Sequence, residues 1–161
     1  MEDSRKELYR SLVTEHSDMV TRLCLLRTGN YTDAEDCYQE VFLKLFKALE
    51  KGRLPEPKAW LIRVTVNQCN SLLRYRLRRP ALRLEDIPEA GESMDSERAL
   101  ETLDAVMRLP ARYREVIYLY YYEGLSAEET AAALGRKIPT VRSQLKRGRE
   151  RLKIMLGEGE L

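Results

Sequence analysis

A short stretch near the C-terminus limits the fold of this chain more than any other. Ser126 is followed three residues later by Glu129, a capping box that predicts a helix beginning at Ala127. Gly135 is expected to end that helix with a left-handed turn, and Pro139 can occupy the first position of the next helix, where its missing N–H costs nothing. Two helices joined by so short a turn predict a helix-turn-helix.

The second helix of this pair carries an apolar stripe and a basic face. Val141, Leu145 and Leu152 recur at spacings of four and seven, which puts them on one side of the helix. Such a basic face can reach base edges and phosphates in a major groove, although a helical hairpin with a solvated basic face is the alternative. The face consists of Arg142, Ser143, Gln144, Lys146, Arg147 and Arg149.

The remainder of the chain favours an all-α protein. Glycine and proline are few, at 8 and 6 of 161 residues, and no Val/Ile-rich alternation indicates strands. The capping box Thr32–Glu35 predicts the start of the second helix, and a loop with two prolines precedes the third. We expect helices over residues 2–28, 33–50, 58–79, 96–108 and 112–122, before the helix-turn-helix.

Apolar spacing identifies the sides of these helices that should face a core. We expect the inward positions to be Leu8, Leu12, Met19, Leu23 and Leu26 on the first helix; Ala34, Cys37, Val41, Leu45 and Leu49 on the second; and Val116, Ile117, Leu119 and Tyr120 on the helix before Gly124. The packing residues of the third helix are expected to include Trp60, Leu61, Val64, Cys69, Leu72 and Leu73.

The opposite side of the second helix is polar and contains one leucine. Leu43 lies among Asp36, Gln39, Glu40 and Lys47 at three- and four-residue spacing. An apolar side chain in the centre of a polar stripe can anchor a partner helix. Single exposed leucines are also common, so a solvated face is the alternative.

Charge separates strongly along the chain, although the net charge is only +2. Residues 58–83 contain seven basic residues and no acidic one, whereas residues 85–104 contain eight acidic residues and one basic residue. This pattern predicts two nucleic-acid surfaces joined by an acidic linker. On the third helix, a stripe without acids suits single-stranded nucleic acid, with a solvated face as the alternative: Arg63, Asn67, Ser71, Arg74 and Arg78.

No residue pattern indicates catalysis, a metal or a cofactor. Cys24, Cys37 and Cys69 are odd in number and widely spaced, so they predict neither a disulfide framework nor a metal pair, and Cys24 and Cys37 are expected to be small buried hydrophobes. A nuclease would need clustered carboxylates, whereas those of residues 33–40 spread around one helix. With no membrane span and a start that does not resemble a signal peptide, the chain is expected to be cytoplasmic. It is expected not to be an enzyme, because no cluster of catalytic residues is visible.

Two blocks of sequence together resemble the extracytoplasmic-function (ECF, group IV) sigma factors of bacterial RNA polymerase, in the sigma-70 family. Asp33-Ala-Glu-Asp-Cys-Tyr-Gln-Glu-Val-Phe-Leu-Lys44 and Ala59-Trp-Leu-Ile-Arg-Val-Thr-Val-Asn67 resemble sigma region 2. Leu109-Pro-Ala-Arg-Tyr-Arg-Glu-Val116 and Thr140-Val-Arg-Ser143 resemble sigma region 4. The resemblance implies a three- or four-helix region 2 over residues 1–80, an acidic linker over 81–95 that occupies the RNA channel, and a region 4 helix-turn-helix over 96–161.

The resemblance also implies partners and the residues that bind them. An alternative sigma factor binds core polymerase, through the clamp helices of the largest subunit and the flap, together with promoter DNA, and is usually held by an anti-sigma factor. The implied polymerase contacts are Asp36, Gln39, Glu40 and Leu43. The implied contacts with the melted −10 strand are Arg53, Leu54, Arg63, Asn67, Ser71, Arg74 and Arg78, with Arg76 and Arg79 on its backbone. The implied contacts with the −35 duplex are Lys137, Thr140, Arg142, Ser143, Gln144, Lys146 and Arg147.

The sequence departs from the family pattern at two places, and it also allows one alternative function. Ser71 stands where many relatives have aspartate. Ile138-Pro139 leaves the last helix without a side-chain cap, and we therefore expect Ile138→Ser to raise the stability of the free protein. The alternative is a polymerase-independent helix-turn-helix regulator, which would typically dimerise on a palindrome.

Overall fold

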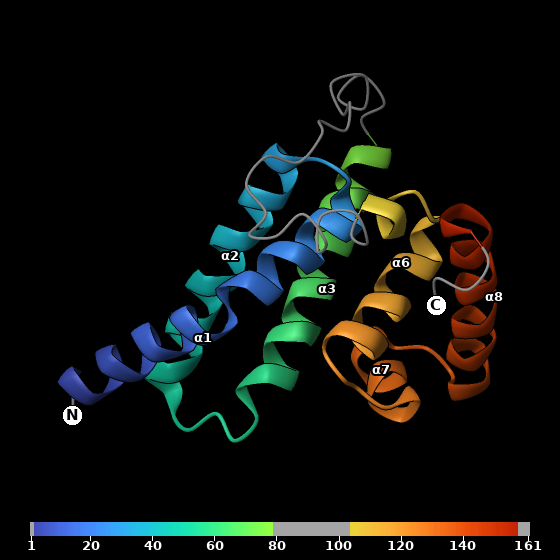
Figure 1. Cartoon of the computed structure of the whole chain (residues 1–161). Helices are drawn as coiled ribbons and strands as arrows, with labels where there is room; N and C mark the ends of the chain where they lie inside the picture. The colour runs from blue at the N-terminus through green and yellow to red at the C-terminus, as the bar shows by residue number, and fades with distance from the viewer. Residues whose placement is uncertain (1, 79–103, 158–161) are drawn as a thin grey trace. The chain divides into compact units, whose positions relative to one another are not determined.

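The chain forms two compact helical units (Figure 1). The computed structural model describes residues 2–78 and 104–157, and the boundary between the units falls within residues 79–103. The predicted all-α class with two small helical domains is therefore confirmed, and the described residues contain no strand. The linker predicted over 81–95, most of the helix predicted over 96–108, and Arg79 lie outside the described residues.

The first unit is a three-helix bundle of α1 (Glu2–Thr28), α2 (Tyr31–Lys51) and α3 (Pro57–Leu77), in which each helix packs against the other two. The apolar positions predicted on α2 are all buried, and so are those on α1 apart from Leu8. Leu8 is 46% exposed, so that expectation was wrong. Residues 2–8 are all exposed, because only one side of this first part of α1 faces the end of α2.

Helix α2 begins earlier than predicted, with a different cap. Its N-cap is Asn30, whose side-chain Oδ1 accepts from the Asp33 backbone N–H at 2.8 Å. The Asn30 side-chain amide also donates to the Asp33 carboxylate at 3.0 Å, so the cap lies two residues before the predicted Thr32–Glu35 pair. Thr32 lies inside the helix, so the predicted capping box was wrong.

The three cysteines converge in the core of the first unit. Cys24 of α1, Cys37 of α2 and Cys69 of α3 are each at most 1% exposed and hydrogen-bond to one another. Thiol donation from Cys24 and Cys69 lowers the pKa of Cys37. Donation to Cys37 raises the pKa of Cys24, and donation to Cys24 and Cys37, together with burial, raises the pKa of Cys69. Burial of Cys24 and Cys37 is confirmed, and their spacing in the sequence gave no sign that the three thiols meet. Over residues 2–78 and 104–157, no group of His, Cys, Asp and Glu could hold a metal ion.

The second unit contains a short helical turn over residues 104–107, then α6 (Ala111–Ile117), η1 (Tyr118–Tyr122), α7 (Ala127–Leu134) and α8 (Ile138–Leu156). The predicted helix-turn-helix is α7 and α8. Ser126 and Glu129 form the capping box, with hydrogen bonds of 3.0 and 2.9 Å. Gly135 ends α7 with φ of 68°, in the left-handed region.

A π-helical turn changes the inward residues before α7. The predicted helix over 112–122 is α-helical only as far as Ile117, and η1 then winds more widely. The wider turn shifts the register, so Tyr118 is buried and Tyr120 is exposed. The expected inward position of Tyr120 was therefore wrong, while Val116, Ile117 and Leu119 are buried as predicted.

Helix α8 packs closely on α6 through a glycine as well as its leucines. Val141, Leu145 and Leu152 are buried as predicted, and Gly148 lies between them. A Cβ at Gly148 would lie 3.0 Å from Cγ1 of Ile117. The absence of a side chain at Gly148 therefore allows the two helices to approach closely.

The start of α8 gives a prediction about stability. Its N-cap is Lys137, with no side-chain hydrogen bond, whereas Ile138 is already the first helical residue and Pro139 the second. The cap expected at Ile138 was therefore one residue too late. We expect Lys137→Ser to raise the free energy of unfolding by about 1 kcal/mol, because serine can accept from the Thr140 N–H. Chemical denaturation should show this gain, and Ile138→Ser, the matched control, should show none.

Candidate functional site

The polar face of α2 forms one candidate surface. Asp36, Gln39, Leu43 and Lys47 are exposed, and Glu40 is half-buried. Leu43 is 46% exposed, as predicted for the centre of this stripe. The buried side chains of α2 point the other way, into the bundle, so this face is available to a partner.

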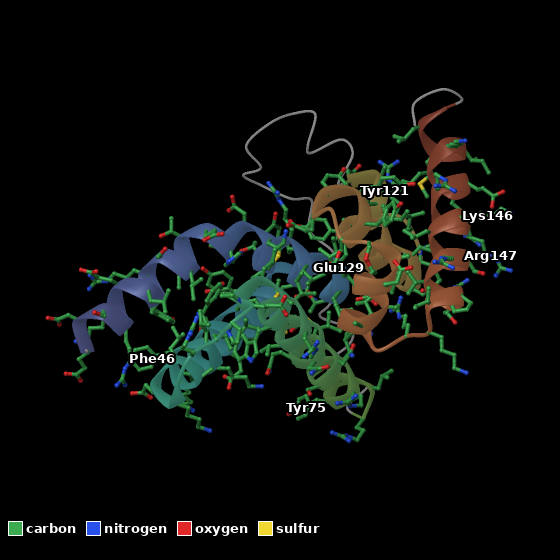
Figure 2. The ribbon with its side chains drawn as sticks, turned by 90° about the horizontal axis from the view of Figure 1, so that it is seen from below. Phe46, Tyr75, Tyr121, Glu129, Lys146 and Arg147 are labelled. Carbon is green, nitrogen blue, oxygen red and sulfur yellow. The ribbon has the colours of Figure 1, made fainter. Side chains whose placement is uncertain are left out.

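Phe46 adds an apolar side chain next to this face, which the sequence analysis missed. It lies three residues after Leu43 and is 38% exposed (Figure 2). The ring of Tyr9 meets Phe46 edge-on, with ring centroids 5.4 Å apart, and the Tyr9 hydroxyl donates to the Phe42 carbonyl at 3.1 Å. These contacts hold Phe46 in place. The i, i+3 spacing from Leu43 was the signal that could have identified it.

The second candidate surface lies along α3. All five side chains of the predicted stripe are exposed. Arg74 Nη2 donates to Ser71 Oγ at 3.4 Å, so neighbouring members of the stripe contact each other. Arg53 is exposed and Leu54 half-buried in the loop that precedes α3. The second candidate surface therefore consists of one side of α3 and the loop that leads into its N-terminus.

Arg76 does not belong to this surface. Its guanidinium donates to the carboxylate of Asp33, which is 1% exposed, at 2.5 Å. The pair joins the end of α3 to the start of α2, 43 residues away in sequence. The role on the DNA backbone that the resemblance gave to Arg76 is replaced by a structural one, because this cation neutralises a buried carboxylate.

The third candidate surface is the exposed side of α8. Lys137, Thr140, Arg142, Ser143, Lys146 and Arg147 are exposed, and only Gln144 of the predicted set is half-buried. Lys146 and Arg147 project from the outer side of the helix (Figure 2). Arg142 forms an ion pair with Glu128 of α7 at 2.9 Å, with both side chains more than half exposed. An exposed pair contributes little stability, so Arg142 can exchange this carboxylate for a phosphate.

Three arginines meet around Tyr113 on one side of α8. The Arg112 guanidinium lies 4.6 Å from the ring centroid and that of Arg151 lies 5.2 Å from it. Arg112 also donates to the Tyr113 hydroxyl at 3.2 Å, and this bond, assisted by Arg147 and Arg151, lowers the pKa of Tyr113. Such a cluster suits an anion such as a phosphate. Arg112 and Arg151 could not be predicted from sequence spacing, because packing of α6 against α8 creates the cluster.

Both units match models of known protein families. Residues 12–79 match the family model of Sigma-70 region 2, and residues 99–152 match that of Sigma-70, region 4. The chain is 35% identical to the ECF RNA polymerase sigma factor SigE of Mycolicibacterium smegmatis, over 91% of this chain and 61% of SigE. It is 32% identical to the ECF RNA polymerase sigma factor SigM of Mycobacterium tuberculosis, over 92% of this chain and 77% of SigM.

A solved structure is similar across both units. The sigma factor RpoE from Bartonella quintana, crystallised with the anti-sigma factor NepR, matches with a TM-score of 0.75 and 26% sequence identity. The match covers 97% of this chain and 98% of that chain. Within the described residues, no helix combines the length and apolar character needed to cross a bilayer.

Proposed function

Because this chain belongs to the sigma-70 family, as one of its ECF sigma factors, we propose that it binds core RNA polymerase and directs initiation at particular promoters. The second unit reads the −35 element as duplex DNA, and the first unit captures the −10 element as a melted strand. One observation carries this proposal: the two sigma regions occur in order, and each unit has its own exposed polar and basic surface.

The first unit is suited to a separated strand. The exposed cations of α3 can follow a phosphate backbone, while Asn67 in the same stripe can hydrogen-bond an unstacked base beside the loop of Arg53 and Leu54. A pocket that accepts only a flipped base favours the open state over the duplex. Melting is thereby driven by binding and needs no catalytic group.

The second unit is suited to duplex DNA. A helix-turn-helix inserts its second helix into a major groove, and α8 carries hydroxyl, amide and cationic side chains on its exposed side. Lys146 and Arg147 are proposed to contact the −35 element together with Lys137, Thr140, Arg142, Ser143 and Gln144. The cluster of Arg112, Arg147 and Arg151 supplies cations for phosphates beside that groove.

Core polymerase is the proposed partner of the α2 face. Asp36, Gln39, Glu40 and Leu43 would contact the clamp helices of the largest subunit, and the second unit would contact the flap. The acidic residues of 81–95 are proposed to join regions 2 and 4 through the RNA channel. RpoE was crystallised with an anti-sigma factor, so we also propose that an anti-sigma factor holds this chain inactive.

Run-off transcription with purified core polymerase on a promoter library tests this function. We expect transcripts only when this chain is added, from templates that share a −35 and a −10 element. A chain that failed to join core polymerase but bound a palindromic operator as a dimer would be a polymerase-independent regulator instead. That alternative is not favoured, because residues 12–79 also match Sigma-70 region 2.

The arginine cluster gives a quantitative prediction. We expect Arg112→Ala and Arg151→Ala each to reduce the slope of log affinity against log salt by about 0.9, the effect of one lost phosphate contact. Holoenzyme binding to a promoter duplex at several salt concentrations measures the slope.

Arg108→Ala is the matched control for that experiment. Arg108 is an exposed arginine of the same unit that pairs with Asp104 at 2.8 Å and belongs to none of the candidate surfaces. Its removal should leave the slope unchanged. Equal slopes for all three variants and the wild type would show that DNA phosphates do not contact this cluster.

A further inference from the structure

Arg136, in the turn between α7 and α8, holds three parts of the second unit together. Its guanidinium donates to the carboxylate of Glu115 on α6, to the Arg112 carbonyl at 3.2 Å and to Gln144 Oε1 on α8 at 2.9 Å. Glu115 is only 1% exposed, so its carboxylate fixes the position of this cation. A planar guanidinium presents its N–H groups in set directions. The direction in which Gln144 finds its donor is therefore fixed as well.

This contact determines which end of the Gln144 amide faces the protein. A guanidinium has donors and no acceptor, so the atom of Gln144 beside it must be the carbonyl oxygen. The usual ambiguity between the oxygen and nitrogen of a side-chain amide is thereby removed. The NH2 group is the end of this half-buried side chain that is left for a ligand of α8.

The orientation of the Gln144 amide limits the bases that this side chain can recognise. A glutamine that reads adenine uses both ends of its amide, since it accepts from N6 and donates to N7. Arg136 occupies one of the two lone pairs of the Gln144 oxygen, and its positive charge repels a further donor such as adenine N6, so Gln144 faces the groove with its NH2 group. Guanine presents two neighbouring acceptors, O6 and N7, and thymine presents O4, whereas adenine places its N6 donor beside its single acceptor N7 and cytosine presents a donor.

We propose that Gln144 reads one base of the −35 element as a donor only, selecting guanine or thymine over adenine and cytosine, and that Arg136 is the positioning residue that imposes this choice. The inference rests on the proposed function of the second unit. It adds the chemical class of base that this side chain accepts.

The test is a base-preference measurement with holoenzyme. Core polymerase is combined with the wild-type chain, Gln144→Ala, Gln144→Glu or Arg136→Lys, and each holoenzyme transcribes a library with a randomised −35 element. The wild type should enrich guanine or thymine about 2- to 10-fold at one position, the range that one neutral hydrogen bond gives. Gln144→Ala should lose that preference. Gln144→Glu should shift it to cytosine, because a carboxylate accepts from N4.

Arg136→Lys separates positioning from mere folding. Lysine keeps a cation beside Glu115 but lacks the guanidinium fork, so the Gln144 oxygen is released and adenine should become accepted at the same position. A purely structural role would lower total transcription without changing the base chosen. Thermal unfolding of each variant verifies that the second unit is folded.

Two results would overturn the inference alone while the −35 element is still selected: adenine enriched by the wild type at the position sensitive to Gln144, or no position altered in Gln144→Ala. Loss of all selection in the −35 segment by the wild-type holoenzyme would instead overturn the proposed function, and the inference with it.

Discussion

Arg76→Ala is expected to lower the free energy of unfolding of the first unit by about 3–5 kcal/mol, the usual cost of removing one partner from a buried ion pair. The Asp33 carboxylate that loses the cation is 1% exposed, and Asn30 is its other hydrogen-bond donor. One amide cannot compensate a buried charge. The loss should be the largest produced by removing any arginine of α3.

Denaturant unfolding followed by tryptophan fluorescence measures this loss, because the single tryptophan, Trp60, reports on the first unit. Arg74→Ala and Arg78→Ala are matched controls, since both side chains are exposed on the same helix. They should change stability by less than about 0.5 kcal/mol and should weaken capture of the melted strand instead. If Arg76→Ala instead kept wild-type stability and weakened DNA binding, Arg76 would be a DNA contact of the α3 stripe and not a structural residue.

Leu43→Asp is expected to weaken binding to core polymerase by about 2 kcal/mol, roughly 30-fold, the loss typical of an apolar anchor at the centre of an interface. Leu43 is exposed in the free chain, so its replacement should leave the fold intact. The aspartate would have to lose its hydration on docking, and the partner would lose its apolar contact.

Leu8→Asp is the control for this experiment, because Leu8 is exposed to the same 46% on α1 of the same unit. Titration of labelled core polymerase with each variant measures the affinity. Leu8→Asp should bind like the wild type. If both variants lose affinity equally, the partner covers α1 as well as α2; if neither does, Leu43 is an ordinary exposed leucine.

Local sequence signals predicted most of the secondary structure. The Ser126–Glu129 capping box and Gly135 placed α7 correctly, because a cap involves residues close together in the chain. Leucine spacing identified the buried side of α2 for the same reason. Predictions failed where two local signals competed. Asn30 capped α2 in place of Thr32, and the π-helical turn η1 left Tyr120 exposed.

The exposed candidate surfaces could also be anticipated from the sequence, since polar residues at helical spacing fall opposite an apolar stripe. Which residues belong to each surface could not be predicted in the same way. Arg76 lies among exposed arginines in sequence, yet it pairs with a carboxylate 43 residues earlier. Arg112 and Arg151 lie outside the predicted set, yet they meet over one tyrosine ring.

The sequence by itself determined which segments of this protein become helices and which side of each helix meets solvent, because caps, turns and periodicity act over a few residues. Only the tertiary structure decided which polar side chains are committed to partners on other helices: Arg76 to Asp33, Arg136 to Glu115 and Gln144, and the three cysteines to one another. The reason is physical. A helical pattern fixes the direction of a side chain around its own axis, whereas its partner is chosen by how separate helices pack.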